Sequence, residues 1–596
     1  MGFVTLATEY AYKGHTMLRG ILSDVLATLQ KKKAIPHDAD LSRIVLDVPP
    51  KGQTGDIATN AAFVLAKALR KPPRAIAGML QEAFEAHPLV ASALVAGAGF
   101  VNIFLNPGAF YAVLSNVLHQ GALYGHGTWG QGKRVNVEYV SVNPTGPLHI
   151  GHGRVAIVGD VMANLLTVSG FDVVREYYVN DAGGQIETLA RSVYLRYREA
   201  HGENIGAIPA GCYPGLYLKD VALALKAQEG RAWLEQDESA WLPFFEAFSV
   251  QLLMQSIKKT MRQIGIQHDV FRSEKDLVSE GRLEKTIDTL ERKGYVYKGT
   301  LQPPKGREKE WTPKELLLFK ATAFGEPQDV PLTKADSGQF TYFAGDMAYH
   351  DDKIERGFNT MINVWGADHA GHVGRLKAAV TALGGAQKTL SFILCQMVHV
   401  LKKGEPLKMS KRAGGFVTLD EVVDVIGCDV LRFIMASRSH DTQLTLDLDE
   451  VLKTSKENPV FYVHYAYARA CSIKRAAADI WDDTICQKDA LLKADFTQLN
   501  RPSEYALMRK MAFWPACIEG ATRTCEPHRI TTFLHDFASL FHTLWGEGHQ
   551  DTTLRFLSGK DKDLSLARLA LVESVRCVIE EGLTILGVTP REQLVD

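Results

Sequence analysis

Apolar and polar residues in the middle of the chain follow a pattern that predicts a strand, a helix and a second strand. Every second position of residues 134–140 is apolar, as expected for a strand: Val135, Val137 and Tyr139. The apolar residues that follow recur at helical spacing as far as Gly170: Val155, Val158, Met162, Leu165 and Leu166. A strand-like run at 172–179 completes a β-α-β unit. Nucleotides bind at strand-to-helix turns of this kind, because free backbone N–H groups and the helix dipole face the phosphates there.

The same patterns divide the chain into three parts, so we expect an α/β multidomain protein. Residues 1–120 predict an N-terminal α+β module, with helices at 18–29, 58–69 and 74–84 and strands at 42–48 and 99–105. Residues 133–450 predict a nucleotide-binding α/β core, with a mostly helical insertion at about 190–300 and buried strands at 361–365 and 391–400. Residues 452–596 keep a helical pattern to the end and predict an α-helical bundle.

The bulk composition fits this division but does not identify a partner. A chain of 596 residues is too long for a single hydrophobic core. Its 46% apolar and 23% charged residues are typical of soluble globular proteins. The 67 basic and 68 acidic residues leave a nucleic-acid partner open, because phosphate binding needs only a local basic surface.

Cysteine usage and the lack of long apolar runs favour a cytoplasmic protein. The eight cysteines are scattered without a Cys-x-x-Cys pair, which argues against a cysteine zinc site and for reduced thiols. No apolar run approaches the roughly 20 residues that span a bilayer. The first residues, which include Glu9 and Lys13, lack the apolar core of a secretory signal. We therefore expect no membrane segment and no metal site built from the protein's own side chains.

The turn between the first strand and the helix carries residues suited to ATP. His149 and His152 are three residues apart, and both can donate hydrogen bonds to phosphate oxygens. Gly151 has no side chain, so a flat adenine can lie against the backbone there. These three residues make the turn a candidate nucleotide site.

A second segment, Lys408-Met-Ser-Lys411-Arg, supplies two ammonium groups. It lies between Gly404 and the glycines at 414–415, which suits a mobile clamp on pyrophosphate. Either segment alone is a weak signal. Both in this order, with the first in a β-α-β turn, indicate nucleotide chemistry strongly.

With these two segments the chain resembles the class I aminoacyl-tRNA synthetases, whose signature sequences are His-Ile-Gly-His and Lys-Met-Ser-Lys. Further blocks are similar to those of arginyl-tRNA synthetases and extend the resemblance over nearly the whole chain: Glu138-Tyr-Val-Ser-Val-Asn143-Pro, Tyr177-Tyr-Val-Asn-Asp181-Ala-Gly-Gly, Tyr342-Phe-Ala-Gly-Asp346-Met-Ala-Tyr-His350, Trp365-Gly-Ala-Asp368-His369 and Asn458-Pro-Val-Phe-Tyr-Val-His-Tyr-Ala. The resemblance implies a Rossmann-like catalytic core that activates L-arginine with ATP. The arginyl-adenylate is then transferred to the 3′ end of an arginine tRNA, releasing AMP; pyrophosphate leaves in the first step. We expect this ligase to be a monomer.

The resemblance also implies which residues handle ATP. Four are catalytic, because they stabilise charge on the phosphorus oxygens: His149, His152, Lys408 and Lys411. Four more residues bind ATP with them: Gly151, Asp368, Met409 and Ser410. Mg²⁺ accompanies the ATP without a dedicated protein cage, as is usual for this ion. His369 and Asp181 are secondary candidates beside this pocket.

Arginine must be recognised through its guanidinium group, which prefers carboxylates in fork geometry. Tyr342 and Asp346 are four residues apart and share one face if that segment is helical. The resemblance implies that these two meet the guanidinium, while Glu138 and Asn143 hold the α-amino and α-carboxylate end or the stem. The alternative is that Glu138 and Asp346 are ordinary surface carboxylates.

In the resembled family, the terminal modules grip the tRNA. The N-terminal module reads the tRNA elbow, for which Phe100 and Asn102 are the candidates. The alternative is that Phe100 belongs to the core and Asn102 to a turn. The C-terminal bundle grips the anticodon arm, but residues 541–548 depart from the family's usual aromatic-tyrosine-asparagine helix ending. Trp545 in this segment remains a candidate for stacking on a base.

Three other functions are less consistent with the sequence. Glutamyl-like or cysteinyl-like specificity conflicts with paired carboxylates, which suit a cation and repel glutamate. Nucleotidylyltransferases share the histidine turn but are usually much smaller and lack a helical C-terminal region. A non-catalytic RNA-binding paralogue would not need an intact pyrophosphate clamp.

Overall fold

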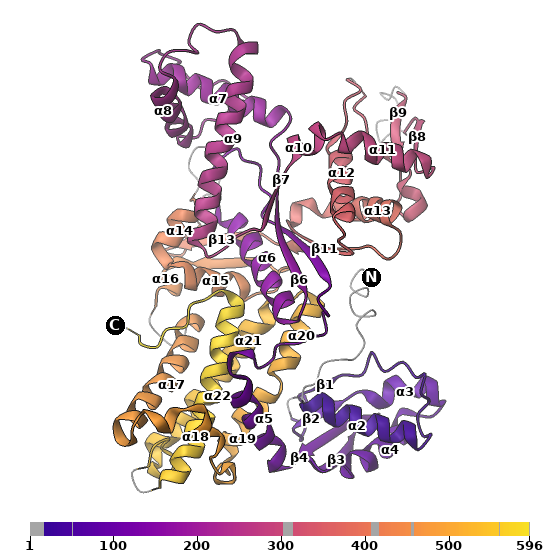
Figure 1. Ribbon diagram of the computed structural model, residues 1–596, viewed down its shortest axis with the longest axis vertical. Helices are drawn as coiled ribbons and strands as arrows, with labels where there is room; N and C mark the ends of the chain where they lie inside the picture. The colour runs from indigo at the N-terminus through magenta and orange to yellow at the C-terminus, as the bar shows by residue number, and fades with distance from the viewer. Residues whose placement is uncertain are drawn as a thin grey trace. The chain divides into compact units, whose positions relative to one another are not determined.

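The computed structural model describes residues 17–50, 52–301, 314–335, 337–406, 417–453, 458–558 and 561–594. These residues form two compact units, whose elements are labelled in Figure 1. The first unit contains the described residues up to Gly132, the segment Asn164–Phe171 and the residues from Lys453 onward. The second unit contains Lys133–Ala163 and Asp172–Leu452.

The second unit is built on a five-stranded parallel sheet with the order β12-β11-β5-β6-β7. Its strands are β5 (Arg134–Tyr139), β6 (Asp172–Val179), β7 (Val270–Ser273), β11 (Thr360–Gly366) and β12 (Thr389–Cys395). The chain runs outward from β5 through β6 to β7, and later from β11 to β12 on the other side of β5. The strand order therefore reverses between β5 and β11, and ligands of such sheets bind at this point, beyond the carboxyl ends of the strands.

Strand β5 is buried on both of its faces. Val135, Val137 and Tyr139 are fully buried, as the alternating pattern predicted. Asn136 and Glu138, the polar residues between them, are buried as well, with exposed fractions of 0% and 3%. A central strand of a parallel sheet is covered on both faces, so its polar side chains must find partners inside the protein.

Helix α6 (Ile150–Val168) follows β5 and confirms the predicted β-α-β unit. It approaches the sheet closely at Gly159, where an added Cβ atom would lie 2.4 Å from Cβ of Tyr139. A side chain at position 159 would therefore push α6 away from β5. This close approach fixes the histidine turn at the start of α6 relative to the carboxyl end of β5.

The connections between the strands carry most of the helices of the second unit. A helical group lies between β6 and β7: α7 (Gly184–Ala200), α8 (Tyr217–Glu229) and α9 (Glu238–Gln263) (Figure 1). The sheet takes its fifth strand, β7, from inside the range expected to be a helical insertion. Between β7 and β11 the chain forms three helices: α10 (Glu274–Ser279), α11 (Arg282–Arg292) and α12 (Tyr342–Glu355). The same connection forms a small antiparallel sheet of β8 (Val296–Gly299), β9 (Leu316–Phe319) and β10 (Val330–Pro331).

The rest of the second unit follows β11. The 3-10 helix η3 (Ala367–His372) and helix α13 (Val373–Gly384) lead to β12. Residues 391–400, which we expected to form one strand, divide between β12 and β13 (Val398–Lys402) of another sheet. The break occurs because the Gln396 N–H donates to the His440 carbonyl at 2.8 Å instead of continuing the ladder. The remaining elements are β14 (Glu405–Pro406), α14 (Leu419–Ile426), α15 (Cys428–Ala436), β15 (Leu444–Asp447) and α16 (Leu448–Val451).

The first unit combines an α+β part with helices from the end of the chain. Its four-stranded antiparallel sheet has the order β1-β2-β4-β3, with strands β1 (Leu46–Asp47), β2 (Ile57–Thr59), β3 (Val90–Ala96) and β4 (Phe100–Leu105). The helices of this part are α2 (Met17–Lys31), α3 (Ala61–Leu69), α4 (Pro73–Glu85) and α5 (Pro107–Gln120). The C-terminal helices are α17 (Pro459–Trp481), α18 (Lys488–Leu492), α19 (Pro502–Ala512), α20 (Trp514–Thr524), α21 (His528–Gln550) and α22 (Lys562–Leu586).

The predicted fold class is confirmed, with a parallel α/β core, an α+β N-terminal part and a helical C-terminal part. Helix α5 packs against α19 and α22 of the C-terminal part. The Tyr111 hydroxyl on α5 donates to the Leu499 carbonyl at 3.2 Å, which joins the two parts of this unit. Among the helices of the described residues, none combines the length and apolar character needed to cross a membrane.

Replacing Gly159 with alanine should destabilise the second unit. We expect a loss of about 1–3 kcal/mol, because the added methyl group must displace α6 from Tyr139. Calorimetric melting of the variant measures the effect. Gly78→Ala is the matched control: its Cβ atom meets nothing within 4 Å in helix α4, so it should be neutral or stabilising by up to ~1 kcal/mol. Equal melting curves for Gly159→Ala and the wild type would contradict the close packing of α6 on β5.

Candidate active site

The turn after β5 has an unusual backbone that the surrounding side chains hold in place. Val140 and Ser141 have positive φ angles of 71° and 42°, which non-glycine residues rarely adopt. The Tyr177 hydroxyl donates to the Val142 carbonyl at 2.7 Å, and the Ser141 hydroxyl accepts from the Tyr178 N–H at 3.1 Å. Such conformations cost free energy and persist where neighbouring structure imposes them, commonly at functional sites.

The two histidines of this turn lie together. The rings of His149 and His152 stack with their centroids 3.5 Å apart. The His149 backbone N–H donates to Nδ1 of His152 at 3.2 Å, so the neutral His152 ring carries its proton on Nε2. At Gly151, an added Cβ atom would approach Cε1 of His149 to 3.1 Å. A side chain at position 151 would therefore press against the His149 ring.

Four predicted residues lie outside the described residues: Lys408, Met409, Ser410 and Lys411. The chain that follows this segment is tied to the histidine turn. Thr418 forms an isolated antiparallel bridge with His149, and the Leu419 N–H donates to the Leu148 carbonyl at 2.8 Å. The hydroxyl of Thr418 also caps the N-terminus of helix α14. The residue that bridges to His149 is therefore held in place as the N-cap of this helix.

The chain that precedes the lysine segment is tied to the same turn through Arg154. This arginine on the first turns of α6 is fully buried. Its guanidinium donates to the Gln396 carbonyl at 2.9 Å, just before β13. It also donates to the carbonyls of Ser439, at 2.8 Å, and Thr442, at 2.7 Å. The histidine turn and both flanks of the lysine segment therefore form one connected framework.

Three carboxylates gather at the carboxyl edge of the sheet: Glu138 on β5, Glu274 at the start of α10 and Asp346 on α12. Burial, together with the smaller effects of the negative charges of Glu138 and Glu274, raises the pKa of Asp346 to about 7. Burial and the charge of Asp181 raise the pKa of Glu274 to about 7. Within the described residues, neither Asp346 nor Glu274 forms an ion pair with a cation. Counting only the part of the chain that the structure describes, this edge of the sheet is therefore short of positive charge.

Glu138, in contrast, forms an ion pair with a buried lysine. Nζ of Lys353, a fully buried residue of α12, lies 2.7 Å from Oε2 of Glu138. Since Glu138 is only 3% exposed, the alternative that it is a surface carboxylate is wrong. Lys353 also donates to Oδ1 of Asn363 at 3.4 Å, which extends the buried network to β11.

His350 joins the same network as a neutral side chain. Its Nδ1 donates to the Asp346 carbonyl at 2.8 Å, and its Nε2 accepts from Nδ2 of Asn363 at 3.0 Å. Burial, with a smaller effect of the Lys353 charge, lowers the pKa of His350 well below its usual range. His350 therefore holds the backbone of Asp346 without adding a positive charge to the cluster.

The other predicted residues of this region occupy separate positions on the same edge. Tyr342 is the first residue of α12 and is 64% exposed. Asn143 lies in the turn after β5, where its Nδ2 donates to Oε1 of Gln185 at 2.7 Å. Asp368 is exposed in η3, and its carboxylate lies 3.6 Å from Nε2 of His369. Asp181 accepts from the Ser273 hydroxyl at 2.7 Å and from the Lys275 N–H at 3.0 Å, which fixes the start of α10.

Sequence reasoning missed Glu274. It follows β7, a four-residue strand in a stretch that we interpreted as helical. A local signal was present, because Ser273 caps α10 by accepting from the Asp276 N–H. That cap indicates a helix start, but it does not reveal that Glu274 lies beside Asp346.

Tyr217 was missed as well. This residue of α8 donates its hydroxyl to the Thr145 carbonyl at 2.5 Å, within the turn after β5. A Cβ atom added at Gly146 would lie 3.0 Å from its ring. A cavity of about 350 Å³ lies next to this contact, between Pro147 and helices α8 and α9. The helical group α7–α9 thus supports the histidine turn from the outside.

In the first unit, the structure contradicts both structural alternatives for Phe100 and Asn102. Phe100 is 46% exposed on β4 and pairs with Phe63 at a ring distance of 4.9 Å, so it is not a core residue. Asn102 is 4% exposed within β4, where its Nδ2 donates to the Thr54 carbonyl at 2.9 Å, so it is not a turn residue. The buried amide supports the strand that presents Phe100.

Trp545 lies on α21 beside a cation. The Arg469 guanidinium lies 4.9 Å from the Trp545 ring centroid and 4.0 Å from that of Tyr465. Arg469 also contacts Nδ1 of His542 at 2.8 Å. Trp545 is therefore part of an arginine–aromatic cluster, a composition suited to stacking on nucleic-acid bases.

Three family models match the chain. The model described as "Arginyl tRNA synthetase N terminal domain" matches residues 16–105, and the model "tRNA synthetases class I (R), catalytic domain" matches residues 113–454. The model "DALR anticodon binding domain" matches residues 463–594. Together these matches cover both units.

Individual proteins with similar sequences or folds carry related descriptions. The chain is 48% identical over 580 residues to the arginine–tRNA ligase of Ruegeria pomeroyi, covering 97% of this chain and 99% of that protein. It is 46% identical over 577 residues to the arginine–tRNA ligase of Rhodopseudomonas palustris, covering 96% of each. A putative arginyl-tRNA synthetase from Campylobacter jejuni matches 82% of this chain with a TM-score of 0.70 and 30% identity, over 100% of that chain. The arginyl-tRNA synthetase of Thermus thermophilus, at 23% identity and a TM-score of 0.71, shares the fold over 97% of this chain and 100% of that chain.

Asp346→Asn should stabilise the protein at alkaline pH. The pKa of Asp346 rises from its usual 3.8 to about 7 in the folded protein, so the folded state holds a proton that the unfolded chain has already released. The free energy of unfolding therefore falls as the pH rises from 4 to 7. The amide removes this cost, so the melting temperature should rise by a few degrees at pH 8, and the gain should vanish below pH 4.

Thermal melts across this pH range measure the effect. Asp368→Asn, which changes an exposed carboxylate on the same edge, is the control and should leave the pH dependence of the melting temperature unchanged. A variant Asp346→Asn that is less stable than the wild type at pH 8 would contradict the excess of negative charge at this site.

Proposed function

Because the chain belongs to the arginyl-tRNA synthetase family, we propose that it joins L-arginine to the 3′ end of tRNA. One observation carries this assignment within the structure. Asp346 and Glu274, two carboxylates without a cation partner among the described residues, stand at the same edge of the sheet as the histidine turn. A guanidinium group supplies the positive charge that this edge lacks. Its several N–H groups can also donate paired hydrogen bonds to two carboxylates.

The first step forms the adenylate. The carboxylate of arginine attacks the α-phosphorus of ATP, the bond to the bridging oxygen breaks, and pyrophosphate leaves with its electron pair. Negative charge builds on the phosphorus oxygens, and His149, His152, Lys408 and Lys411 are proposed to stabilise it. The tie between His149 and Thr418 supports this grouping, because it places Thr418, which follows the lysine segment in the chain, at the histidine turn.

The second step transfers the aminoacyl group. A ribose hydroxyl of the terminal nucleotide of the tRNA attacks the carbonyl carbon of the adenylate, AMP leaves, and an ester forms. Holding the two reactants in line accounts for much of the rate of such steps.

The proposed arginine site places each end of the substrate. Asp346 and Tyr342 bind the guanidinium group together with Glu274. Glu138 and Asn143 hold the α-amino and α-carboxylate end or the stem. Glu138 reaches this position as the partner of Lys353, so the pair adds little net charge beside the substrate's carboxylate.

For ATP, we propose that Gly151 lies against the adenine and that Asp368, Met409 and Ser410 complete the nucleotide site. Mg²⁺ enters with ATP and neutralises phosphate charge. Within the described residues, no group of three or more histidine, cysteine, aspartate or glutamate side chains could hold a metal ion.

The first unit is proposed to bind the tRNA. The N-terminal part, residues 1–120, would present Phe100, supported by Asn102, to the elbow, while the bundle 452–596 would present Trp545 to the anticodon arm. The core in this division is residues 133–450. We further propose a monomer in the cytoplasm, in keeping with eight cysteines that form no disulfide.

The function is tested by ATP–pyrophosphate exchange with each of the amino acids, with and without tRNA. We expect exchange with arginine alone among them, and only when tRNA is present, because docking of tRNA supplies the binding energy that orders the loops around Tyr342 and Asp346. Full exchange without tRNA would refute this coupling but not the arginine specificity. Exchange with glutamate or cysteine in place of arginine would refute the function itself.

The lysine segment is tested by Lys408→Ala and Lys411→Ala. Each should lower kcat for activation by about a hundredfold or more, with the fold and tRNA affinity nearly intact, because the clamp acts mainly in the transition state. Lys402→Ala, which removes an exposed lysine from the adjoining strand β13, is the matched control and should keep wild-type rates. Unchanged aminoacylation by both lysine-segment variants would remove the segment from the mechanism.

A further inference from the structure

The two unpaired carboxylates of the proposed arginine site come from different elements. Asp346 belongs to α12, and Glu274 is the first residue of α10, directly after β7. Their charges repel each other, and a fork of guanidinium donors requires a fixed separation between them. Some interaction must therefore hold α12 and the end of β7 together.

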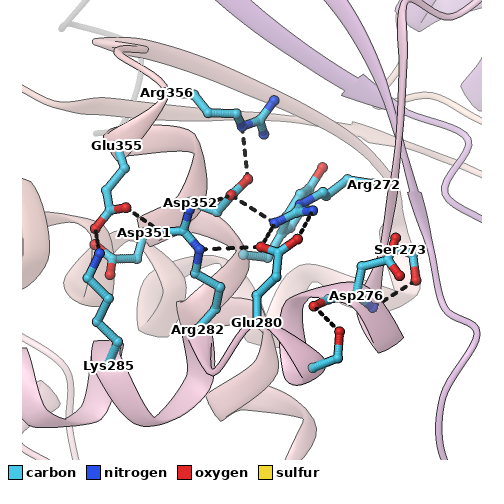
Figure 2. Close-up of polar contacts among 12 residues, drawn as sticks. Arg272, Ser273, Asp276, Glu280, Arg282, Lys285, Asp351, Asp352, Glu355 and Arg356 are labelled. Carbon is cyan, nitrogen blue, oxygen red and sulfur yellow. Dashed lines mark hydrogen bonds and ion pairs between the residues drawn. The ribbon is translucent and has the colours of Figure 1, made fainter.

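Arg272 provides such an interaction. It lies on β7, two residues before Glu274, and its guanidinium lies 3.1 Å from Oδ1 of Asp352 on α12 (Figure 2). It also forms two hydrogen bonds with Glu280, at 2.9 and 2.5 Å. The strand that directly precedes Glu274 is thereby attached to the helix that carries Asp346.

Asp352 is well suited to hold this cation, because it is buried and has further partners of its own. It is 2% exposed. Arg356 lies 2.8 Å and Arg282 lies 3.7 Å from its carboxylate, as Figure 2 shows together with the Arg272 contact. A buried carboxylate held among three guanidinium groups resists displacement, because moving it would leave buried charges without their partners.

The C-terminal end of α12, which carries Asp352, is also fixed to the sheet. Arg356 forms two hydrogen bonds, at 2.8 and 2.7 Å, with Glu176 of β6, which is fully buried. The Tyr349 hydroxyl donates to the same carboxylate at 2.8 Å. Helix α12 is thus anchored to β6, and Arg272 attaches β7 to the anchored helix.

Resting on the proposed arginine site, we infer that the Arg272–Asp352 ion pair is a positioning pair for arginine specificity: it holds Glu274 at the separation from Asp346 that a guanidinium group requires. Neither residue touches the substrate in this account. Their effect reaches the substrate through the backbone of Ser273 and Glu274, which Asp181 fixes from the other side.

The same helices offer a matched control. Glu355 on α12 pairs with Arg282 and with Lys285 of α11, at 2.6 Å from the lysine (Figure 2). Arg282 also contacts Glu280 and Asp352, but Glu355 itself pairs only with residues of α11 among the ion pairs of the described residues. Glu355→Gln therefore removes an ion-pair partner from the same helix while leaving the Arg272–Asp352 pair in place.

The test measures KM for arginine, KM for ATP and kcat by pyrophosphate exchange in the presence of tRNA, using the full chain. Arg272→Gln should raise KM for arginine roughly tenfold to a hundredfold, while KM for ATP stays within about threefold, because only the guanidinium site is displaced. Asp352→Asn, which removes the other end of the pair, should reproduce this result. Arg272→Lys keeps a cation beside Asp352 and should restore much of the arginine affinity.

A double-mutant cycle separates positioning from general damage. In a Glu274→Gln background, Arg272→Gln should have little further effect on KM for arginine, because the carboxylate that it positions is already absent. Multiplicative effects of the two substitutions, or an equal rise of KM in Glu355→Gln, would overturn the inference. So would an unchanged KM for arginine in folded Arg272→Gln. Failure of the proposed function is distinguishable from these outcomes, because the wild-type protein would then not activate arginine at all.

Discussion

Repulsion among Glu138, Glu274 and Asp346 is the interaction around which the second unit is organised. Placing these carboxylates at one edge of the sheet, with Lys353 as the only buried lysine among the described residues, costs folding free energy, as the raised pKa values of Asp346 and Glu274 indicate. A protein tolerates such a cost where a ligand removes it. In the proposed function this ligand is the guanidinium cation of arginine, and the surrounding elements must keep the carboxylates in place until it binds.

A network of buried polar side chains keeps these carboxylates in place. Glu176 accepts hydrogen bonds from Asn136, Tyr349 and Arg356, which join three elements, and Arg356 holds the pKa of this carboxyl below its usual range against the opposing effect of burial. A carboxylate satisfied this fully fixes the relative position of β5, β6 and α12, because every displacement would leave a buried group without its partner.

Local patterns predicted the parts of the fold that depend on hydrophobic spacing. Strand β5 and helix α6 followed from the alternation at Val135, Val137 and Tyr139 and from the helical spacing after it. The same pattern gave no indication that Asn136 and Glu138 would be buried, because their partners Glu176 and Lys353 lie far away in the sequence. From the sequence alone, a buried polar side chain cannot be distinguished from a solvent-exposed one, because its partner is not known.

The candidate site also has parts that local sequence patterns predict and parts that depend on the tertiary fold. Short motifs indicated the histidine turn and the lysine segment, whereas the connection of Thr418 to His149 depends on the tertiary fold. Glu274 could not be found from the sequence, because β7 is short and lies between helices, and because its neighbour Asp346 comes from another element. The roles of Asp346 and Tyr342 came from resemblance. The structure adds the reason that Asp346 suits a cation, which is its shortage of positive partners.

The central claim is that arginine binds as a cation to carboxylates that partly hold protons near pH 7. Calorimetric titration of the tRNA-saturated protein with arginine at pH 7, in buffers of different ionisation enthalpy, measures the protons exchanged on binding. The account predicts release of up to about one proton, because the guanidinium group stabilises the ionised forms of Asp346 and Glu274 and displaces the protons that they carry in the free protein. The release should be smaller in Asp346→Asn and should disappear in wild-type protein at pH 9. Binding at pH 7 without proton release, or with proton uptake, would contradict the account.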